Sequence, residues 1–526
     1  MASAAHADVP YTSHAFVQTH PRRLSTVAWL VGLDAPDPRS ARVLELGCAS
    51  GGNLLPLACE YPDASFLGVD LSATSIAEGK QAISELRLNN VELVQADLAT
   101  WEYDGPPFDY IVAHGLYSWM PAHVRERILA ICRRHLNRQG VAYISYNTQP
   151  GWSLRGVLRD FLRFGADGNQ DSAAQTRDAR QLLQVLAAAL PPGRAPQASF
   201  VQHEIQRLAH QPDDYLFHEF LASTNEPLYF REFVADARRH DLRYLGESEY
   251  SWMSSNDLPP EVAQSIRARA KNQEEFEQYL DFVRWQLFRQ TLLCHAEHEL
   301  SRNVPPERMY ELYLAAELKI EGLTRPLGSE EVVTFLRPKS RMSTSQPITK
   351  AALVTLAESW PRWWSFDELL RASLEKLNVP ADHGTPIEHL PHASELAETL
   401  RRAYGVALLD LARVPPRVSA TIDETPQATV WARRQAERIP VVPNVAHQSH
   451  SLQGFQRFVL TLLDGRRTHE QLLDEVTLQA RESVALQDAA GQPLTDVARV
   501  RDVLRETLER TLLELKNLGY LVLPER

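Results

Sequence analysis

Residues 45–53, Glu-Leu-Gly-Cys-Ala-Ser-Gly-Gly-Asn, constrain the fold more than any other segment of this 526-residue chain. They follow an apolar run at 42–44 and precede a helical pattern at 54–58. A strand that ends in a glycine-rich turn and opens a helix presents backbone N–H groups to a ligand. Glu45 stands just before the turn, and its negative charge opposes phosphate. The segment therefore favours a ligand with a cationic or hydroxyl-rich end.

Three other interpretations of this loop are possible. It lacks the Gly-Lys-Ser/Thr ending that a P-loop requires. A dinucleotide fingerprint reads GxGxxG, whereas the segment from Gly47 to Gly52 has Ala49 at the middle glycine. A tight turn between strand and helix that binds nothing is the third interpretation, and the loop alone leaves it open.

Acidic residues follow several strand-like runs on the same predicted edge. Four such runs lie at 65–72, 91–98, 108–115 and 140–147, with helical stretches at 73–86 and 121–135. Asp70 lies about twenty residues past the loop, where doubly wound sheets place an acid that binds ribose hydroxyls. Asp97 ends the next run and suits an adenine amino group. One aspartate at a strand end is usually a helix cap, but with Glu45 these acids predict a ligand site.

These residues resemble the class I S-adenosylmethionine-dependent methyltransferases, and the match covers residues 40–150. The loop looks like their first motif, with Ala49 where many members carry glycine; alanine leaves space for the cofactor if its backbone torsions are ordinary. The resemblance implies that Asp70 binds the ribose and that His114 lies beside the sulfonium. The full set of cofactor residues that it implies is Glu45, Gly47, Cys48, Ala49, Gly51, Asn53, Asp70, Leu71, Asp97, Leu98 and His114.

Further segments narrow the family. They lie at 11–21, 114–121, 145–152, 218–221 and 227–230. They recur in methyltransferases with a methyltransferase regulatory domain, similar to bacterial protein lysine methyltransferases that act on outer-membrane proteins. The resemblance implies a protein substrate with reactive lysines. A small-metabolite methyltransferase and a non-catalytic cofactor-binding scaffold stay open as alternatives.

Aromatic side chains follow the fourth and fifth strands and are candidates for the acceptor site. In-line methyl transfer mainly needs alignment and exclusion of water, but a lysine must lose its proton before it attacks, and an apolar aromatic pocket lowers its pKa. We expect Tyr117 and Tyr146 to orient the amine, with Trp119 beside them. Trp119 and Trp152 equally suit packing against a neighbouring domain. His114 suits cofactor binding, proton acceptance or a hydrogen bond to the loop.

The composition predicts a multidomain cytoplasmic protein. The length exceeds one ordinary domain, no apolar run could span a bilayer, and the first residues lack a signal-peptide pattern. The formal charge of −12 argues against a nucleic-acid surface. The four cysteines are scattered, and the histidine pairs at 295/298 and 447/450 lack a third ligand, so neither disulfides nor a metal are expected. A homodimer is a further expectation.

The chain divides into five predicted regions. They are an N-terminal segment with the methyltransferase core (1–165), a helical insertion that forms a regulatory region (166–227), the completion of the sheet (228–300), and two winged-helix-like modules (301–425 and 426–526). The N-terminal helical segment, 11–36, is expected to lie over the cofactor. Runs at 241–247 and 288–295 are expected to close a seven-stranded Rossmann-like α/β sheet as an antiparallel pair.

The two C-terminal modules share a pattern of helix, turn, capped helix, long helix and strand. Ser365 and Thr468 each precede an acid or amide by three residues, which indicates a capping box. Winged helices often bind DNA through a basic helix. Here the second helices carry acids instead (Asp367, Glu368, Glu470, Asp474 and Glu475). The modules therefore favour a protein-binding or scaffolding role over DNA binding.

Overall fold

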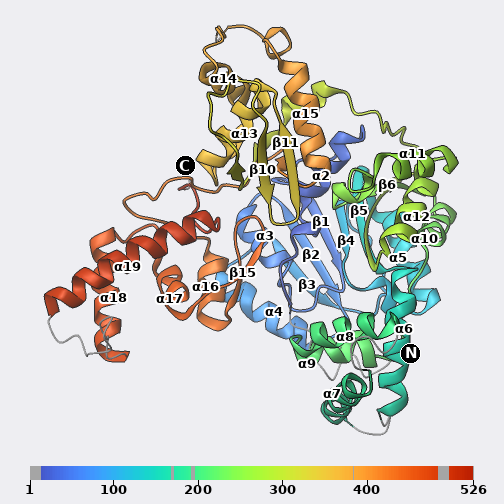
Figure 1. Cartoon of the computed structure of the whole chain (residues 1–526). Coiled ribbons are helices and arrows are strands. Elements are labelled where there is room, and N and C mark those ends of the chain that lie inside the picture. The colour runs from blue at the N-terminus through green and yellow to red at the C-terminus, as the bar shows by residue number, and fades with distance from the viewer. Residues whose placement is uncertain (1–12, 167–170, 191–195, 383, 484–496, 525–526) are drawn as a thin grey trace.

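The computed structural model describes residues 13–166, 171–190, 196–382, 384–483 and 497–524. A seven-stranded sheet with the order β3-β2-β1-β4-β5-β7-β6 lies at its centre (Figure 1). The strands are β1 (Arg42–Leu46), β2 (Ser65–Asp70), β3 (Val91–Gln95), β4 (Phe108–Ala113), β5 (Leu136–Asn147), β6 (Leu242–Glu247) and β7 (Phe288–His295). The first five pair in parallel, and β7 pairs antiparallel with both β5 and β6. The structure thus confirms the predicted sheet and its antiparallel closing pair.

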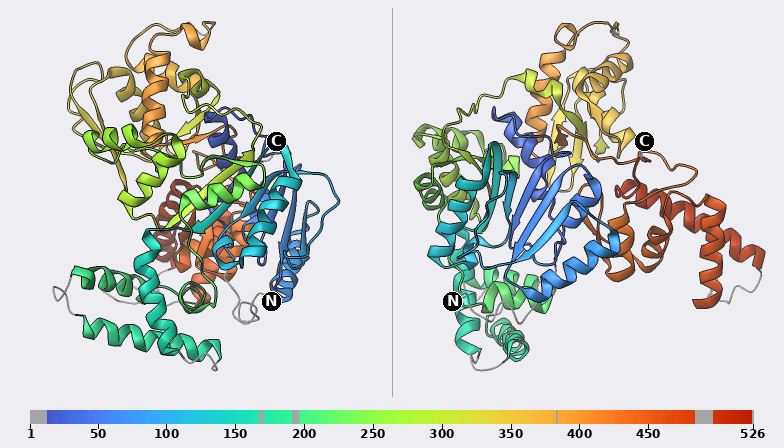
Figure 2. Two further views of the ribbon diagram at one scale, coloured as in Figure 1. Left: turned by 90° about the vertical axis from the view of Figure 1, so that its right-hand side faces the viewer. Right: turned by 180° about the vertical axis from the view of Figure 1, so that it is seen from behind.

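Helices cover both faces of this sheet, as the rear view in Figure 2 shows. They are α2 (Pro21–Leu30), α3 (Leu54–Glu60), α4 (Ala73–Leu86), α5 (Ala122–His135), α10 (Phe230–Arg239), α11 (Pro260–Arg269) and α12 (Gln273–Arg284). Leucine and valine side chains of α2 and α3 share one core with Val43 and Tyr143, whereas α5 and α10 share another with Leu44 and Ile144. Successive strand residues point to opposite faces, so each buried strand supplies both cores.

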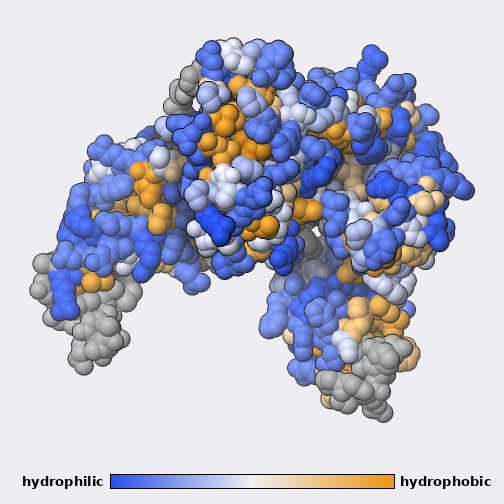
Figure 3. Space-filling model, turned by 45° about the horizontal axis from the view of Figure 1, so that its top comes forward, coloured by the Kyte–Doolittle hydropathy of each residue, from blue (hydrophilic) through white to orange (hydrophobic). Residues whose placement is uncertain are grey.

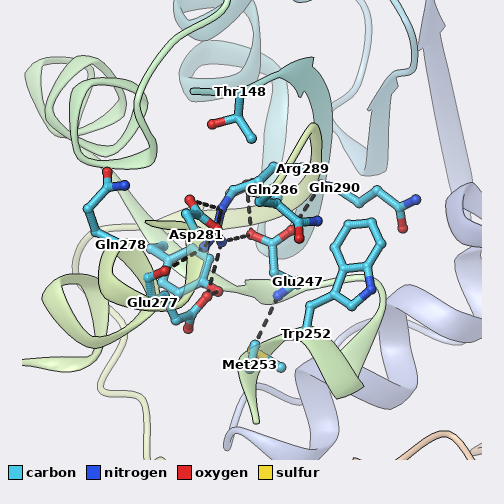
Figure 4. A network of polar contacts seen from close by, with 12 residues as sticks. Thr148, Glu247, Trp252, Met253, Glu277, Gln278, Asp281, Gln286, Arg289 and Gln290 are labelled. Atoms are coloured by element: carbon cyan, nitrogen blue, oxygen red, sulfur yellow. Dashed lines mark hydrogen bonds and ion pairs between the residues drawn. The ribbon is translucent and has the colours of Figure 1, made fainter. Parts of the chain in front are cut away.

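The antiparallel pair is held by a buried arginine (Figure 4). Arg289 of β7 lies 2.7 Å from Glu247, 3.1 Å from Glu277 and 2.9 Å from Asp281. All four side chains are at most 4% exposed. Burial raises the pKa of Glu247 to about 7, since a single cation serves three acids. This network ties β6, β7 and α12 together.

A helical insertion projects from the carboxyl edge of the sheet, at the bottom of Figure 1. It contains α6 (Gly151–Gly165), α7 (Ser172–Ala189), α8 (Pro196–Ala209), α9 (Asp213–Leu216) and η3 (Phe217–Leu221). Leu158 and Leu162 of α6 pack in one cluster with Leu183, Leu208 and Phe217 of the other helices. Because α6 belongs to that cluster, we propose that the insertion begins near residue 151; the predicted start was residue 166.

The region at 301–425 joins two small antiparallel sheets to three helices. Its elements are η5 (Pro306–Glu311), β8 (Tyr313–Ala315), β9 (Lys319–Glu321), β10 (Val333–Arg337), β11 (Ser340–Thr344), α13 (Pro347–Ser359), β12 (Trp364–Ser365), α14 (Phe366–Lys376), η6 (Ile387–His389), α15 (Ala393–Gly405) and β13 (Asp410–Ala412). Ser365 and Glu368 form the predicted capping box. The predicted long helix corresponds to α15, and the predicted strand after it is the three-residue β13.

The last region forms the arm at the left of Figure 1. It contains α16 (Val430–Arg438), β14 (Val441–Pro443), β15 (Ser449–Ser451), α17 (Gly454–Leu462), α18 (His469–Ser483) and α19 (Val497–Asn517). Thr468 and Gln471 exchange the predicted capping hydrogen bonds. Arg434 of α16 pairs with Glu85 of α4 at 2.6 Å, so the region rests on the sheet domain. In the part of the chain that the structure describes, no helix has the length and apolarity needed to cross a membrane.

Candidate functional site

The carboxyl ends of the parallel strands bring the predicted cofactor residues to one edge of the sheet. Glu45 lies near the end of β1 in the centre, and the loop at 47–53, here called the cofactor loop, follows this strand. Asp70 ends β2 on one side, and His114 follows β4 on the other. Open α/β sheets bind ligands at such an edge, where the strand order reverses. β1 is that reversal point, because β2 and β4 flank it.

The cofactor loop is shaped by residues with positive φ. Gly47 and Gly51 have φ of 76° and 79°, and Ala49 has φ of 47°. The condition of ordinary backbone torsions at Ala49 is therefore not met: this alanine lies in the left-handed region, which costs about 1 kcal/mol. Oδ2 of Asp70 accepts a hydrogen bond from the Ala49 backbone N–H at 2.8 Å, which holds the strained residue in place.

Glu45 is a buried acid with one oxygen left without a partner. Its Oε1 accepts a hydrogen bond from Nδ2 of Asn53 at 2.9 Å. Its buried Oε2 has no hydrogen-bond partner among the described residues. Burial raises the pKa of Glu45 to about 8. A cation placed against the free oxygen would favour the charged carboxylate, so this position fits the cationic end of S-adenosylmethionine.

The N-terminal segment contacts the cofactor loop; its predicted place over a bound cofactor stays a prediction. Oγ of Ser13 accepts a hydrogen bond from the Gly52 backbone N–H at 2.8 Å, and Oδ1 of Asn53 accepts one from Phe16 at 3.0 Å. The Phe16 ring packs on His114 with a centroid distance of 4.1 Å. Residues 11 and 12 of the predicted helical segment lie outside the described residues, and the helical part consists of η1 (Val17–Thr19) and α2.

The remaining predicted cofactor residues surround the loop. Oδ1 of Asp70 accepts a hydrogen bond from Ser72 N–H at 2.8 Å, and Leu71 is 50% exposed. Asp97 is exposed, and Leu98 is buried in the core. Cys48 is also buried, and a Cβ on Gly68 of β2 would lie 2.6 Å from its Sγ. The structure brings these side chains to one edge; their individual contacts with a cofactor stay predictions.

His114 is a neutral imidazole in a buried setting. Its Nδ1 lies 2.9 Å from the Tyr143 hydroxyl and 3.2 Å from Oγ of Ser145. Burial lowers the pKa of His114 to about 3, and burial keeps the Tyr143 phenol protonated by raising its pKa. An imidazole with so low a pKa is a weak base at neutral pH. Its geometry therefore favours positioning over proton acceptance.

The aromatic candidates separate into two groups. Tyr117 and Tyr146 are each 1% exposed and pack on Phe233 of α10 with centroid distances of 5.3 and 4.2 Å. Trp119 is partly exposed at the sheet edge. Trp152 is buried and packs against Phe220 of the insertion, which agrees with its packing role. The catalytic roles expected for Tyr117, Tyr146 and Trp119 stay predictions.

A cavity of about 260 Å³, here called the edge cavity, lies between the sheet edge and the insertion. His114, Trp119 and Phe288 line it from the sheet side, together with part of Tyr146. The insertion contributes Arg155, Tyr215 and Glu219. None of these three residues belongs to the site predicted from the sequence. The motif at 218–221 was the signal that pointed toward Glu219.

One group of possible metal ligands also forms, and its hydrogen bonds oppose metal binding. His20, Glu60 and His447 meet where α2, α3 and the C-terminal region join. Nδ1 of His20 accepts a hydrogen bond from Arg22 N–H at 3.1 Å, so a neutral His20 carries its proton on Nε2. That nitrogen lies 3.3 Å from Glu60, which also pairs with Arg22. We assign the group to packing between the regions.

Three family models match the chain. A "Methyltransferase domain" matches residues 43–140, a "Predicted methyltransferase regulatory domain" matches 212–295, and a "PKMT, C-terminal winged helix domain" matches 424–520. The second range covers β6, β7 and the end of the insertion. It overlaps the predicted regulatory region only at 212–227.

Known proteins resemble the chain over very different lengths. The protein RP789 of Rickettsia prowazekii (strain Madrid E) is 31% identical over 515 residues, which cover 96% of this chain and 91% of the relative. The solved structure of PKMT2 from Rickettsia typhi in complex with AdoHcy is 28% identical, with a TM-score of 0.86, and the match covers 98% of this chain and 100% of that one. Trans-aconitate 2-methyltransferase from Azoarcus sp. (strain BH72) is 35% identical over 105 residues, 20% of this chain and 38% of the relative.

Proposed function

Because this chain belongs to the S-adenosylmethionine-dependent methyltransferases of the PKMT type, we propose that it methylates lysine side chains of a protein substrate. The predicted family, enzyme class and cofactor are confirmed. The observation that carries the lysine proposal is the likeness to PKMT2 over nearly the whole chain, since it includes the insertion and both C-terminal regions. Fold alone does not name a substrate, so the acceptor is the proposed part.

The residues of the cofactor loop fit S-adenosylmethionine. The cofactor supplies an activated methyl group, and the chain supplies alignment and a dry surrounding. We propose that Glu45 faces the cationic end, with Gly47, Ala49 and Gly51 along the methionine portion. Asp70 would bind the ribose hydroxyls and Asp97 the adenine. The proposed contacts further include Cys48, Asn53, Leu71, Leu98 and His114.

The edge cavity supports an amine acceptor. Trp119, Tyr215 and Phe288 give it aromatic walls, which suit a lysine side chain through its apolar stem and cationic head. The cavity lies beside His114, the residue predicted to sit near the sulfonium. The substrate would enter between the sheet edge and the insertion.

A small-molecule methyltransferase is the alternative function. Its support is the likeness to a trans-aconitate enzyme, which covers only a fifth of the chain around the cofactor domain. A small acidic acceptor would meet Glu219 in the edge cavity, and two carboxylates repel each other at short distance. Arg155, which also lines the cavity, pairs with Glu204, so Glu219 is the lining charge without an ion pair among the described residues and favours the lysine proposal.

Incubation with methyl-labelled S-adenosylmethionine in a lysate of the native host tests the proposal. We expect label in protein, recovered as methyllysine after acid hydrolysis. The Asp70→Ala variant serves as the matched inactive control. Label confined to small molecules would contradict the lysine assignment and favour the alternative.

We further propose a cytoplasmic homodimer that modifies an outer-membrane protein before its export. The four cysteines are free thiols, which suits a reducing compartment.

Apolar side chains lie exposed on the insertion: Val157 is 67%, Phe164 is 94% and Val185 is 61% exposed. Figure 3 shows apolar surface on this lobe, at the lower right. A contiguous exposed apolar patch is typical of a protein interface. Light scattering of Phe164→Ser tests self-association; a dimer that persists at every concentration would argue against this surface.

The C-terminal regions support substrate binding or scaffolding. The helix α14 carries Asp367 and Glu368 in its first turn, and Glu470 of α18 pairs with Arg501 and Arg505. Acidic second helices oppose nucleic acid. No nucleic-acid partner is therefore proposed.

A further inference from the structure

A π-helical turn in the insertion carries an acid in the edge cavity. The turn is η3, and the Ala222 N–H bonds to the Phe217 carbonyl, five residues back, at 3.0 Å. Single π turns are rare in proteins, and those that occur often lie at functional sites. Glu219 lies within this turn and lines the edge cavity, which the sheet residue His114 also lines.

Three arginines lie near Glu219, yet each is bound elsewhere. Nε of Arg155 lies 2.9 Å from the buried carboxylate of Glu204, and Arg207 lies 3.0 Å from the same carboxylate. The Arg159 guanidinium donates to the Ala222 carbonyl. Within the described ranges of the chain, the side-chain carboxylate of Glu219 has no hydrogen bond or ion pair. Glu204 thus pairs with two of these cations, Arg155 and Arg207, and none of the three arginines forms an ion pair with Glu219.

We propose that Glu219 binds the protonated ε-amino group of the acceptor lysine in the edge cavity and removes one proton from it before methyl transfer. This inference rests on the proposed function, because it requires a cationic amine as the acceptor. It adds a named specificity and proton-accepting residue to that function. A carboxylate that lacks a partner in a cavity with aromatic walls attracts an ammonium group and repels acidic acceptors.

The proton balance of the step is complete. The ammonium N–H bond breaks, and the proton passes to a carboxylate oxygen of Glu219. The lone pair of the neutral amine then forms the N–C bond while the S–C bond breaks and its electron pair stays on sulfur. The proton on Glu219 returns to solvent when the product leaves. No oxidant, reductant or metal is needed.

The surroundings of Glu219 suit this exchange. Burial raises its pKa to about 7, against the opposing charges of Arg155, Arg207 and Arg159. The pKa of Tyr215, the neighbouring phenol, is raised by burial, so it stays neutral. A lysine begins near a pKa of ~10.4 in water, and desolvation in the cavity lowers that value toward the carboxylate. His114, with a pKa of about 3, is a much weaker base.

The test compares Glu219→Gln and Glu219→Asp with Glu261→Gln, an exposed acid on α11 that serves as the matched control. Each variant is assayed for methyllysine formation in dialysed host-lysate protein from pH 6 to 9. We expect Glu219→Gln to lower kcat/KM by about 100-fold, the scale of acid–base assistance, and to lose the acidic limb of the pH profile. Glu219→Asp should recover part of the rate and keep that limb.

Two further measurements separate the failure modes. Calorimetric S-adenosylmethionine binding and the melting temperature should match wild type in all variants, since Glu219 belongs to the insertion and not to the cofactor loop. A Glu219→Gln rate and pH profile equal to those of wild type would overturn the role of Glu219 alone. A wild-type enzyme that labels metabolites but no lysine would overturn the proposed function and this inference together.

Discussion

The cofactor loop and the edge cavity lie side by side at one sheet edge, but they are built in opposite ways. In the loop, Asp70 uses both oxygens to bind backbone N–H groups, and Asn53 uses both ends of its amide. In the cavity, the Glu219 carboxylate has no hydrogen bond or ion pair among the described residues. The backbone of the loop is held by side chains before any ligand arrives, with one Glu45 oxygen left free for the ligand. In the cavity, the free carboxylate of Glu219 holds no backbone in place.

This difference suits two substrates of different kinds. Preorganised hydrogen bonds reduce the ordering cost when one invariant ligand binds. Free polar groups in a partly apolar cavity recognise a charged end group while leaving the rest of the acceptor unspecified. The loop side therefore fixes the methyl donor, and the cavity side selects for an amine.

The largest expected effect comes from Arg289, which supports the strands behind the edge cavity. Arg289→Met should lower the free energy of unfolding by about 3–5 kcal/mol, because three acids would lose their buried partner. The loss should shrink toward pH 5, as Glu247 takes up a proton. Urea unfolding measures it.

Arg238→Met is the matched control, since its pair with Glu274 lies at the surface, where Arg238 is 58% exposed. Such pairs contribute less than about 1 kcal/mol. Equal losses in the two variants would contradict a structural role for the buried network.

The second prediction concerns Asp70→Ala, which disrupts the cofactor loop. It removes the hydrogen bond that holds Ala49 and, on our proposal, those to the ribose. Two lost bonds to a charged group, at about 1.5 kcal/mol each, predict S-adenosylmethionine binding weaker by about 100-fold. Calorimetry measures the dissociation constant. Asp63 is an exposed acid before β2, and Asp63→Ala should bind S-adenosylmethionine like wild type. A wild-type affinity in Asp70→Ala would contradict the proposed role of Asp70 in cofactor binding.

Glu45 makes donor binding depend on pH. With a pKa of about 8 it is protonated at pH 7, and a bound cation favours the charged form. Binding should therefore release a proton, and affinity should rise by about tenfold from pH 6.5 to 7.5. It should level off near pH 8, where the α-amino group of the ligand loses its charge. Calorimetry in two buffers of different ionisation enthalpy counts the proton. Glu45→Gln should release none; the same release from this variant would assign the proton elsewhere.

The loop could be predicted from sequence because its parts are adjacent or lie at regular strand ends. Glu45, Asp70 and the closing strands all follow from local patterns. The edge cavity could not be predicted in this way, because its lining residues come from the end of β4 and from a turn about a hundred residues later in the sequence. Tyr146 shows the same limit: strand alternation places it on the face of Ile144, where Phe233 of α10 covers it. Only the tertiary packing reveals that neighbour.

The smallest expected effect concerns the strained alanine in the loop. Ala49→Gly removes a Cβ at φ 47° and relieves about 1 kcal/mol of strain, but the glycine also gains freedom in the unfolded chain, which costs up to about 1 kcal/mol. Stability should stay within about 1 kcal/mol of wild type, and donor affinity within threefold, because Asp70 still holds the backbone N–H. Ala77→Gly, in the exposed interior of α4, has no strain to relieve and should lose about 1 kcal/mol. Urea unfolding of both variants separates the two cases. A loss of donor affinity beyond tenfold in Ala49→Gly would mean that the methyl group of Ala49, rather than the backbone held by Asp70, shapes the donor side.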